Sequence, residues 1–223
     1  MSETMEDLVY ARLKKAIIKR YIRPRGQLVE ESIARQLGVS RTPVRGAIRR
    51  LVYEGFVEII PHRGAFVIKP TKEEVLWAFE VREILEKHAA ALAAPFVTPE
   101  LLEQLRQCVA EESRVFEQRD VEAYYKINDR FHYAIAEASG NLVLKQYIVD
   151  IVSKTTIYLI LFDPFYQMEV NPSMKEHSRI IDALATKDAA QACESMALHI
   201  KSAVEGMELD AFKEQPPDGY IEI

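Results

Sequence analysis

The stretch from Ser40 to Gly55 constrains the fold more than any other part of the chain, because it carries two different stripes at helical spacing. Three aliphatic side chains form an apolar stripe, made of Val44, Ile48 and Leu51. Three arginines spaced four residues apart form a basic stripe, made of Arg41, Arg45 and Arg49. Residues at these spacings share one face of a helix. The stretch therefore predicts a helix that packs through its aliphatic side and directs its guanidinium groups outward.

The ends of this helix carry matching signals. Ser40 is placed to accept an N–H of the first turn with its hydroxyl, and Pro43 falls within that turn, where a missing N–H costs little. Gly55 follows the last helical residue and can take the left-handed closing conformation. An outward guanidinium fits phosphate oxygens, or the O6/N7 edge of guanine in a major groove. A solvated basic face, common on soluble helices, is the alternative interpretation.

The segments on either side of this helix favour the DNA interpretation. A short helix is predicted over residues 30–37, and the Gly-Val-Ser turn after it is typical of a helix-turn-helix. Two stretches of alternating apolar residues, 56–60 and 65–68, flank a basic turn and predict a β-hairpin. Two more elements complete a winged helix-turn-helix: a helix over residues 5–21 and a strand over residues 27–29 that pairs with the hairpin.

Charge is divided unevenly along the 223 residues. Residues 1–70 contain 14 Lys and Arg against 7 Asp and Glu, which gives a formal charge of +7. The remaining 15 basic and 27 acidic residues give residues 71–223 a charge of −12. Such an asymmetry predicts that the first segment faces a polyanion. We therefore predict two domains, a DNA-binding domain over residues 1–70 and a different domain over residues 71–223.

The motifs of the first segment resemble those of the GntR family of bacterial transcription regulators. The resemblance covers roughly residues 8–69 and rests on Gln27-Leu28-Val29-Glu30, Leu37-Gly38-Val39-Ser40-Arg41-Thr42-Pro43-Val44-Arg45, Leu51, Glu54-Gly55 and Arg63-Gly64. It implies that the recognition helix and the wing contact DNA. The residues expected to do so are Arg41, Thr42, Arg45, Arg49, His62, Arg63 and Gly64. Two positions depart from the family pattern: Gly46 stands where an acidic residue is common, and Glu31 where some members carry a basic one.

From Thr71 onward the pattern is helical. Capping signals and helix breakers predict six helices, over residues 71–94, 98–118, 120–139, 141–162, 173–186 and 188–212. Ser173 and Glu176 have the spacing of a capping box. The first four residues and the tail after residue 212 are predicted to be loose. Long helices with short links are typical of an antiparallel bundle, so the predicted fold class is mainly α with a small β-hairpin wing.

Three histidines fall in different helices of this bundle: His132, His177 and His199. Asn128 precedes His132 by four residues and shares its face of the helix. His177 and His199 lie on helices joined by a short turn, so these helices are expected to be antiparallel neighbours. Three imidazoles and one oxygen ligand suit Zn²⁺, Ni²⁺ or a similar divalent cation. Ordinary core or surface histidines are the alternative, which the spacing leaves open.

The bundle also resembles the effector domain of the FadR subgroup of this family. The resemblance covers most of residues 71–212 and rests on Val81-Arg82, Leu85-Glu86, Phe131-His132, Ala138-Ser139-Gly140-Asn141, Glu176-His177 and Leu198-His199. It implies a divalent metal held by one acidic residue and three histidines, with a small organic acid bound beside it. Carried onto this chain, the metal ligands are Asn128, His132, His177 and His199. Asn128 therefore places a neutral amide where the family has a carboxylate, and Asp129 lies about 100° further round the helix and is not expected to replace it.

The same resemblance places the effector beside the metal. Arg82 is expected to bind the effector's carboxylate through its guanidinium fork, with Thr155 as a polar group in the same cavity. A surface ion pair between Arg82 and Glu86, four residues on, is the alternative role of this arginine.

These patterns predict a DNA-binding transcription regulator, not an enzyme. We expect a repressor that binds a palindromic operator as a homodimer, with an operator affinity controlled by a small organic acid. The alternatives are a metal-dependent enzyme, against which no carboxylate is evident as a general base beside the three histidines, and a regulator that responds to the metal itself.

The sequence also favours a cytoplasmic protein. The two cysteines, Cys108 and Cys193, lack the spacing of a metal or redox motif. No signal sequence opens the chain, and the longest apolar run is too short to span a membrane. No membrane partner is therefore expected.

Overall fold

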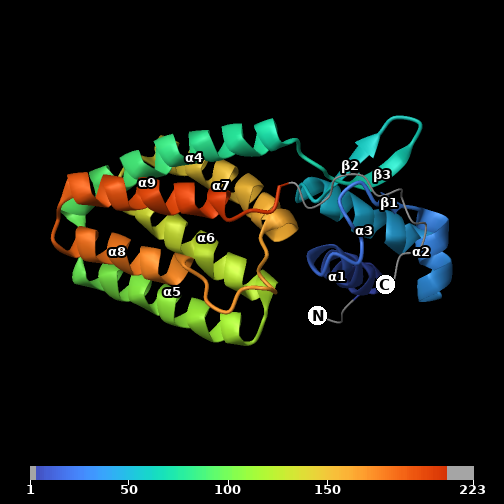
Figure 1. Cartoon of the computed structure of the whole chain (residues 1–223). Coiled ribbons are helices and arrows are strands. Elements are labelled where there is room, and N and C mark those ends of the chain that lie inside the picture. Colours follow the sequence, from blue (N-terminus) through green and yellow to red (C-terminus); the bar gives the residue numbers. More distant parts are fainter. Residues whose placement is uncertain (1–3, 210–223) are drawn as a thin grey trace. The chain divides into compact units, whose positions relative to one another are not determined.

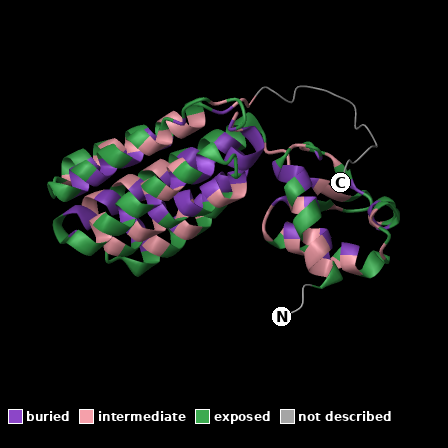
Figure 2. Ribbon diagram, turned by 90° about the horizontal axis from the view of Figure 1, so that it is seen from below, coloured by how far each residue is buried: buried purple, intermediate pink, exposed green. Residues whose placement is uncertain are grey.

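The computed structural model describes residues 4–209, which divide into two compact units. The first ends at Pro70 and the second spans Thr71–Leu209. In the first unit, helices pack beside a small sheet, and the second consists of helices (Figure 1). Buried residues lie on the inward faces of the helices within each unit, coloured purple on the ribbon (Figure 2). The predictions for residues 1–3 and for the tail lie outside the described residues.

The N-terminal unit is a three-helix domain with a three-stranded antiparallel sheet. Its elements are α1 (Met5–Ile18), β1 (Gln27–Leu28), α2 (Glu30–Leu37), α3 (Arg41–Tyr53), β2 (Val57–Ile60) and β3 (Gly64–Val67). Strand β3 lies between β1 and β2, with Gln27 paired to Phe66 and Val57 to Val67. The order of elements confirms the predicted winged helix-turn-helix, in which β2 and β3 form the wing.

The aliphatic stripe of α3 packs into the core of this unit. Val44 and Leu51 are fully buried and Ile48 is nearly so. They join fully buried side chains of the neighbouring elements, namely Val9, Leu13, Ile17, Ile33 and Val67. Each such side chain contributes about 1.5–3 kcal/mol when it leaves water, so α3 is anchored by its apolar side. Its basic side is left on the surface.

The two ends of α3 differ in how well they follow the prediction. Gly55 adopts a φ of 85°, as the predicted left-handed closure requires. Ser40 occupies the N-cap position, but its side chain makes no capping hydrogen bond. A capping hydroxyl accepts from the second or third helical N–H, and Pro43, at the third position, has none. The sequence therefore predicted the start of the helix correctly and the bond at its cap incorrectly.

Helix α1 also departs from the prediction at both ends. Thr4, predicted to be loose, caps the helix in a capping box with Asp7. The helix ends at Ile18 rather than at residue 21, because Arg20 adopts a φ of 61°. The chain then folds back, and Ile22 donates its N–H to the carbonyl of Ala16. Burial of the Ile22 side chain accompanies this reversal.

The second unit is a helical bundle. Its helices are α4 (Lys72–Ala93), the short 3₁₀ helix η1 (Ala94–Phe96), α5 (Pro99–Glu117), α6 (Val121–Ala138), α7 (Leu142–Phe162), α8 (Ser173–Ala185) and α9 (Ala189–Glu205). Helix α4 packs against α9 and α7, and α5 packs against α6 and α8. Within the described residues, the six α-helices confirm the predicted bundle. None of the helices described combines the length and the apolarity needed to cross a membrane.

Two details of this unit were predicted wrongly. Helix α9 ends at Glu205 instead of near residue 212, because the following residues turn and Glu208 donates its N–H to the carbonyl of Phe162 at the end of α7. Ser173 and Glu176 form no capping box at the start of α8. The carboxylate of Glu176 instead contacts His199 of α9, so tertiary packing overrides the local signal.

Candidate functional site

The basic side of α3 is the first candidate site. All seven residues predicted to contact DNA are exposed: Arg41, Thr42, Arg45, Arg49, His62, Arg63 and Gly64. The aliphatic anchor described above explains this exposure for the arginines, because burying one face of α3 fixes the direction of the other. Two of these arginines, Arg41 and Arg45, nevertheless contact an acidic residue of the chain itself, Glu30 of α2.

Glu30 was not predicted as a site residue. Its Oε1 accepts from Nε of Arg45 at 3.0 Å, and its Oε2 accepts from Nη2 of Arg45 at 2.9 Å and from Nη2 of Arg41 at 3.1 Å. The hydrogen bonds from Arg45 lower the pKa of Glu30 to about 2, so the carboxylate stays ionised at neutral pH. The side chains of Arg41 and Arg45 remain 60% and 52% exposed, so both can still reach a duplex.

The tip of the wing presents its polar groups at the surface. His62 has a φ of 61° and Gly64 a φ of 103°, a value that favours glycine. Gln27 of β1 donates to the carbonyl of Arg63 at 2.7 Å and so ties the tip to the first strand. The guanidinium of Arg63 lies over the ring of Phe66 at 5.3 Å from its centre. The wing is thus a braced turn that carries a histidine and an arginine.

The two departures from the family pattern have structural counterparts. A Cβ at position 46 would lie 2.0 Å from Oε2 of Glu6, so Gly46 leaves room for the carboxylate of α1. An alanine there would require the flexible Glu6 side chain to rotate. Glu31 is exposed and pairs with Arg35 one turn later on α2, at 3.1 Å.

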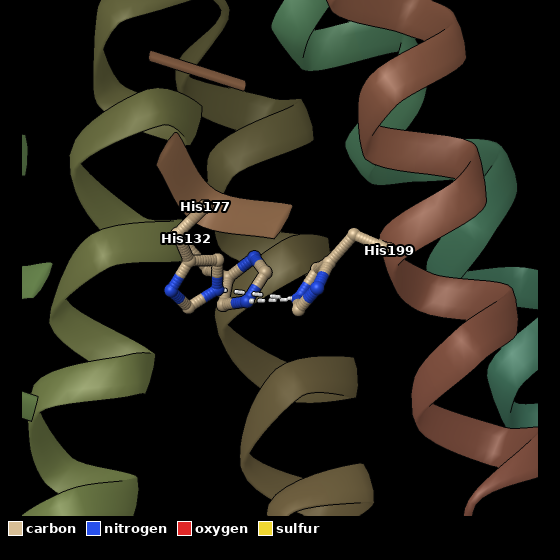
Figure 3. A group of neighbouring side chains, drawn as sticks. All are labelled: His132, His177 and His199. Atoms are coloured by element: carbon tan, nitrogen blue, oxygen red, sulfur yellow. Dashed lines mark hydrogen bonds between the residues drawn. The ribbon is translucent and has the colours of Figure 1, made fainter. Parts of the chain in front are cut away.

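The second candidate site is a cluster of three buried histidines in the bundle. His132 lies on α6, His177 on α8 and His199 on α9, and their imidazoles point toward one another (Figure 3). Nε2 of His199 lies 3.2 Å from Nε2 of His177 and 3.4 Å from Nε2 of His132. The structure therefore brings together the three histidines that the sequence placed on separate helices. They also form a group whose ligand atoms are close enough to hold one metal ion.

A glutamate contacts the Nδ1 atom of each ring, and burial raises the pKa of one of them, Glu112, to about 8. Glu86 contacts Nδ1 of His132 at 2.5 Å, Glu112 contacts Nδ1 of His177 at 2.9 Å, and Glu176 contacts Nδ1 of His199 at 2.9 Å; we call these three residues the outer carboxylates. The sequence showed no carboxylate placed as an evident general base near the histidines, and it did not reveal these contacts to Nδ1. These glutamates come from three different helices, so no local pattern in the sequence joins them to their histidines.

The protonation of the rings follows from their surroundings. Burial lowers the pKa of His132 to about 3 and that of His177 well below its usual value, so both rings are neutral near pH 7. Burial raises the pKa of Glu86, but His132 and Arg82 outweigh this effect and bring it down to about 2. An ionised Glu86 accepts a hydrogen bond from Nδ1–H, which leaves the Nε2 lone pair of His132 directed into the cluster.

This arrangement fits a divalent cation. Imidazoles that donate Nδ1–H to a carboxylate and offer Nε2 are the usual form of metal-binding histidine, and lone pairs that face one another repel unless a proton or a cation lies between them. Asn128 is buried one turn before His132, and its Nδ2 has no hydrogen-bond partner in the described part of the chain. Asp129 accepts from Oγ1 of Thr156 at 2.6 Å and does not belong to the cluster, as predicted.

Arg82 connects this cluster to the second predicted effector residue. Its side chain is 1% exposed, its Nε donates to Glu86 at 2.6 Å, and its Nη1 donates to Oγ1 of Thr155 at 3.2 Å. The ion pair with Glu86 thus exists, but it is buried rather than on the surface. Because Glu86 also contacts His132 through its other oxygen, a continuous polar chain runs from Thr155 to the histidines.

A winged helix-turn-helix followed by a helical bundle with a buried polar centre defines a two-domain, DNA-binding regulator. Residues 6–67 match the bacterial regulatory proteins of the gntR family, and residues 78–202 match the FCD domain. The chain therefore belongs to the GntR family of bacterial transcription regulators and carries an FCD domain. This confirms the predicted family and the prediction that the protein is a regulator and not an enzyme.

Relatives and solved structures agree with this assignment. The HTH-type transcriptional repressor RspR of Escherichia coli (strain K12) is 24% identical over 208 residues, which cover 92% of this chain and 90% of RspR. The HTH-type transcriptional regulator LutR of Bacillus subtilis (strain 168) is 29% identical over 191 residues, 76% of this chain and 85% of LutR. The structure of E. coli McbR/YncC has a TM-score of 0.63 at 25% identity and covers 92% of this chain and 97% of its own.

Proposed function

We propose that this regulator binds one divalent metal ion in its helical domain and represses transcription until a small organic acid binds beside that ion. The observation that carries the proposal is the convergence of three Nε2 atoms, each on a ring whose Nδ1 contacts a glutamate. A regulator of transcription works where the chromosome lies, so the proposed location is the cytoplasm. RspR, a relative over most of the chain, is named a transcriptional repressor.

The metal ion would be held by His132, His177 and His199, with Asn128 as a candidate oxygen ligand. A set of three imidazoles suits Zn²⁺ or Ni²⁺. When bound, such an ion supplies a concentrated positive charge that attracts a carboxylate. The protein's own contribution is to hold the rings at fixed angles through the outer carboxylates and to exclude water by burial.

The effector's carboxylate would be bound by Arg82, with Thr155 beside it. The two hydrogen bonds of Arg82 fix the plane of its guanidinium, and a fixed guanidinium can bind a carboxylate through two parallel bonds. Because Glu86 contacts both Arg82 and His132, a change at the metal would alter the position of Arg82, which would bind the effector. Such an acid can weaken DNA binding only if the dimer has one arrangement that binds DNA and another that does not, and the acid binds the second more tightly.

This proposal is tested by measuring operator affinity in three conditions. A duplex is first selected from a random-sequence library with the purified protein, and its affinity is then measured as isolated, after treatment with a chelator, and with a panel of small mono-, di- and tricarboxylic acids. We expect at least one acid to weaken binding only when metal is present. An effect of chelator alone, with none from any acid, would identify the metal itself as the signal, and turnover of an acid would indicate an enzyme.

The proposed dimer surface is an exposed apolar face of α4. Trp77, Val81 and Ile84 are 63%, 46% and 53% exposed and share one face at helical spacing. We expect Trp77→Glu combined with Ile84→Glu to convert a dimer into a monomer, because two charges would enter an apolar contact on each side of the two-fold axis. Light scattering after size-exclusion chromatography measures this. Leu142→Glu, an exposed apolar position on α7, is the matched control, and a double variant that remains dimeric would place the interface elsewhere.

A further inference from the structure

Glu30 joins the two helices of the helix-turn-helix at the point where DNA would be read. It is the first residue of α2, and its carboxylate is bonded to two arginines of α3, Arg41 and Arg45. Its side chain is 27% exposed and lies among the positive groups that were predicted to bind a polyanion. A carboxylate in this position needs an explanation, because it removes charge from the surface that binds phosphates.

The bonding pattern at Arg45 supplies one. A guanidinium has two edges that can bind a planar acceptor pair: the side edge, formed by Nε and Nη2, and the outer edge, formed by Nη1 and Nη2. Glu30 occupies the side edge of Arg45 with two bonds, at 3.0 and 2.9 Å. The outer edge is left for another acceptor pair. The O6 and N7 atoms of guanine form such a pair in the major groove.

We propose that Glu30 is a specificity-determining residue, which braces Arg45 so that its outer edge reads a guanine in each operator half-site. The inference rests on the proposed role of α3 in DNA recognition. Without the brace, the long side chain of Arg45 can rotate and bind any phosphate, since phosphate contacts carry no sequence information.

The bond between Glu30 and Arg41 has a related effect. Oε2 also accepts from Nη2 of Arg41, so one negative charge is shared by two guanidinium groups. The three side chains together carry a net charge of +1 instead of +2. Because affinity for DNA of any sequence rises with the number of phosphates neutralised, Glu30 lowers non-specific binding while it fixes the direction of Arg45. Both effects increase the ratio of specific to non-specific affinity.

The test compares base preference with overall DNA affinity. Wild-type protein and the variants Glu30→Gln, Glu30→Asp and Arg45→Ala are each used to select duplexes from a random-sequence library, followed by sequencing. Each is also titrated by fluorescence anisotropy against one fixed duplex of mixed sequence at several salt concentrations. Glu31→Gln is the matched control, because Glu31 is the next residue and pairs with Arg35 outside α3. Thermal unfolding of each variant verifies the fold.

We expect the wild-type protein and Glu31→Gln to enrich a guanine at one fixed position of each half-site. Glu30→Gln should weaken this preference by roughly tenfold, the effect of losing a well-oriented bidentate contact. It should also bind the mixed duplex more tightly, and its log affinity should fall more steeply with log salt concentration, by about one unit of slope. Glu30→Asp keeps the charge but shortens the arm, so it should lose the preference without the gain in mixed-duplex affinity. Two separate effects, of geometry and of charge, are thereby distinguished.

Several results would overturn the inference. Absence of an enriched guanine in the wild-type selection, or an unchanged guanine preference in folded Glu30→Gln and Glu30→Asp, would each do so. If Arg45→Ala loses the preference and Glu30→Gln keeps it, Arg45 reads the base unaided and only the role of Glu30 fails. If Arg45→Ala keeps it, the proposed role of Arg45 fails, and the inference fails with it.

Discussion

Operator affinity is expected to fall by at least roughly tenfold when Arg45 is replaced by alanine, because one bidentate base contact discriminates by about 1–3 kcal/mol. A dimer that binds a palindrome makes this contact in both half-sites, so the loss of binding free energy occurs twice. Arg45→Ala combined with Arg49→Ala should reduce binding to the level seen with unrelated DNA. The measurement is an anisotropy titration against the selected duplex at fixed salt, since affinities depend steeply on salt.

The fold and the second unit should be unaffected by these changes. Arg45 and Arg49 are exposed on α3, whose anchor is the aliphatic stripe on its other side. The melting temperature and metal content should therefore match those of the wild-type protein. Arg106→Ala, at an exposed arginine of α5, is the control for a general loss of positive charge. Unaltered operator affinity in the double variant would contradict the assignment of α3 as the recognition helix.

The second large effect is expected at the histidine cluster. Protein purified without chelator and then exposed to Zn²⁺ or Ni²⁺ should retain about one ion per chain after gel filtration. His199→Ala should abolish this retention, because Nε2 of His199 lies within 3.4 Å of the corresponding atom of both other histidines. Glu176→Gln should weaken affinity by about 10–100-fold, the usual consequence of losing the charged group that orients a metal-binding imidazole, since Glu176 contacts Nδ1 of His199. Elemental analysis and competition with a chromogenic chelator measure both.

His88→Ala is the matched control for the metal experiment, since His88 is exposed on α4 and lies outside the cluster. Its metal retention should equal that of the wild-type protein. Equal retention in His199→Ala, or no retained ion in the wild-type protein even after soaking, would leave the three histidines as hydrogen-bonded core residues. The DNA-binding domain should be unchanged in either case, so operator affinity without effector checks that the variants are folded.

The winged helix-turn-helix could be predicted because its signals are local. The aliphatic and basic stripes of α3, the left-handed glycine after it and the alternating residues of the wing each act over a few residues. Two capping predictions failed: the cap at Ser40 lacks its bond because Pro43 has no N–H, and the Glu176 side chain contacts His199 instead of the start of its own helix. In the second case a contact between helices outweighed a short-range preference.

The candidate metal site could be predicted from the sequence only in part. The sequence placed the three histidines on separate helices, and the resemblance to a family grouped them as metal ligands. It gave no sign of the outer carboxylates, which lie 46, 65 and 23 residues from their histidines along the chain. Which side chain meets which imidazole depends on the rotation and depth at which neighbouring helices pack. Those quantities are set by the whole core and not by any one segment.

The amino-acid sequence alone determined the elements of this protein, the faces they bury and its membership of a family of DNA-binding regulators, because these depend on the spacing of residues along one segment. Only the tertiary structure decided that Glu30 shares its charge between two arginines of α3, and that each clustered imidazole rests on a carboxylate from another part of the bundle. The physical reason is that hydrogen bonds and ion pairs require atoms within about 3 Å. Such proximity between distant residues arises only when the packed core fixes the helices against one another.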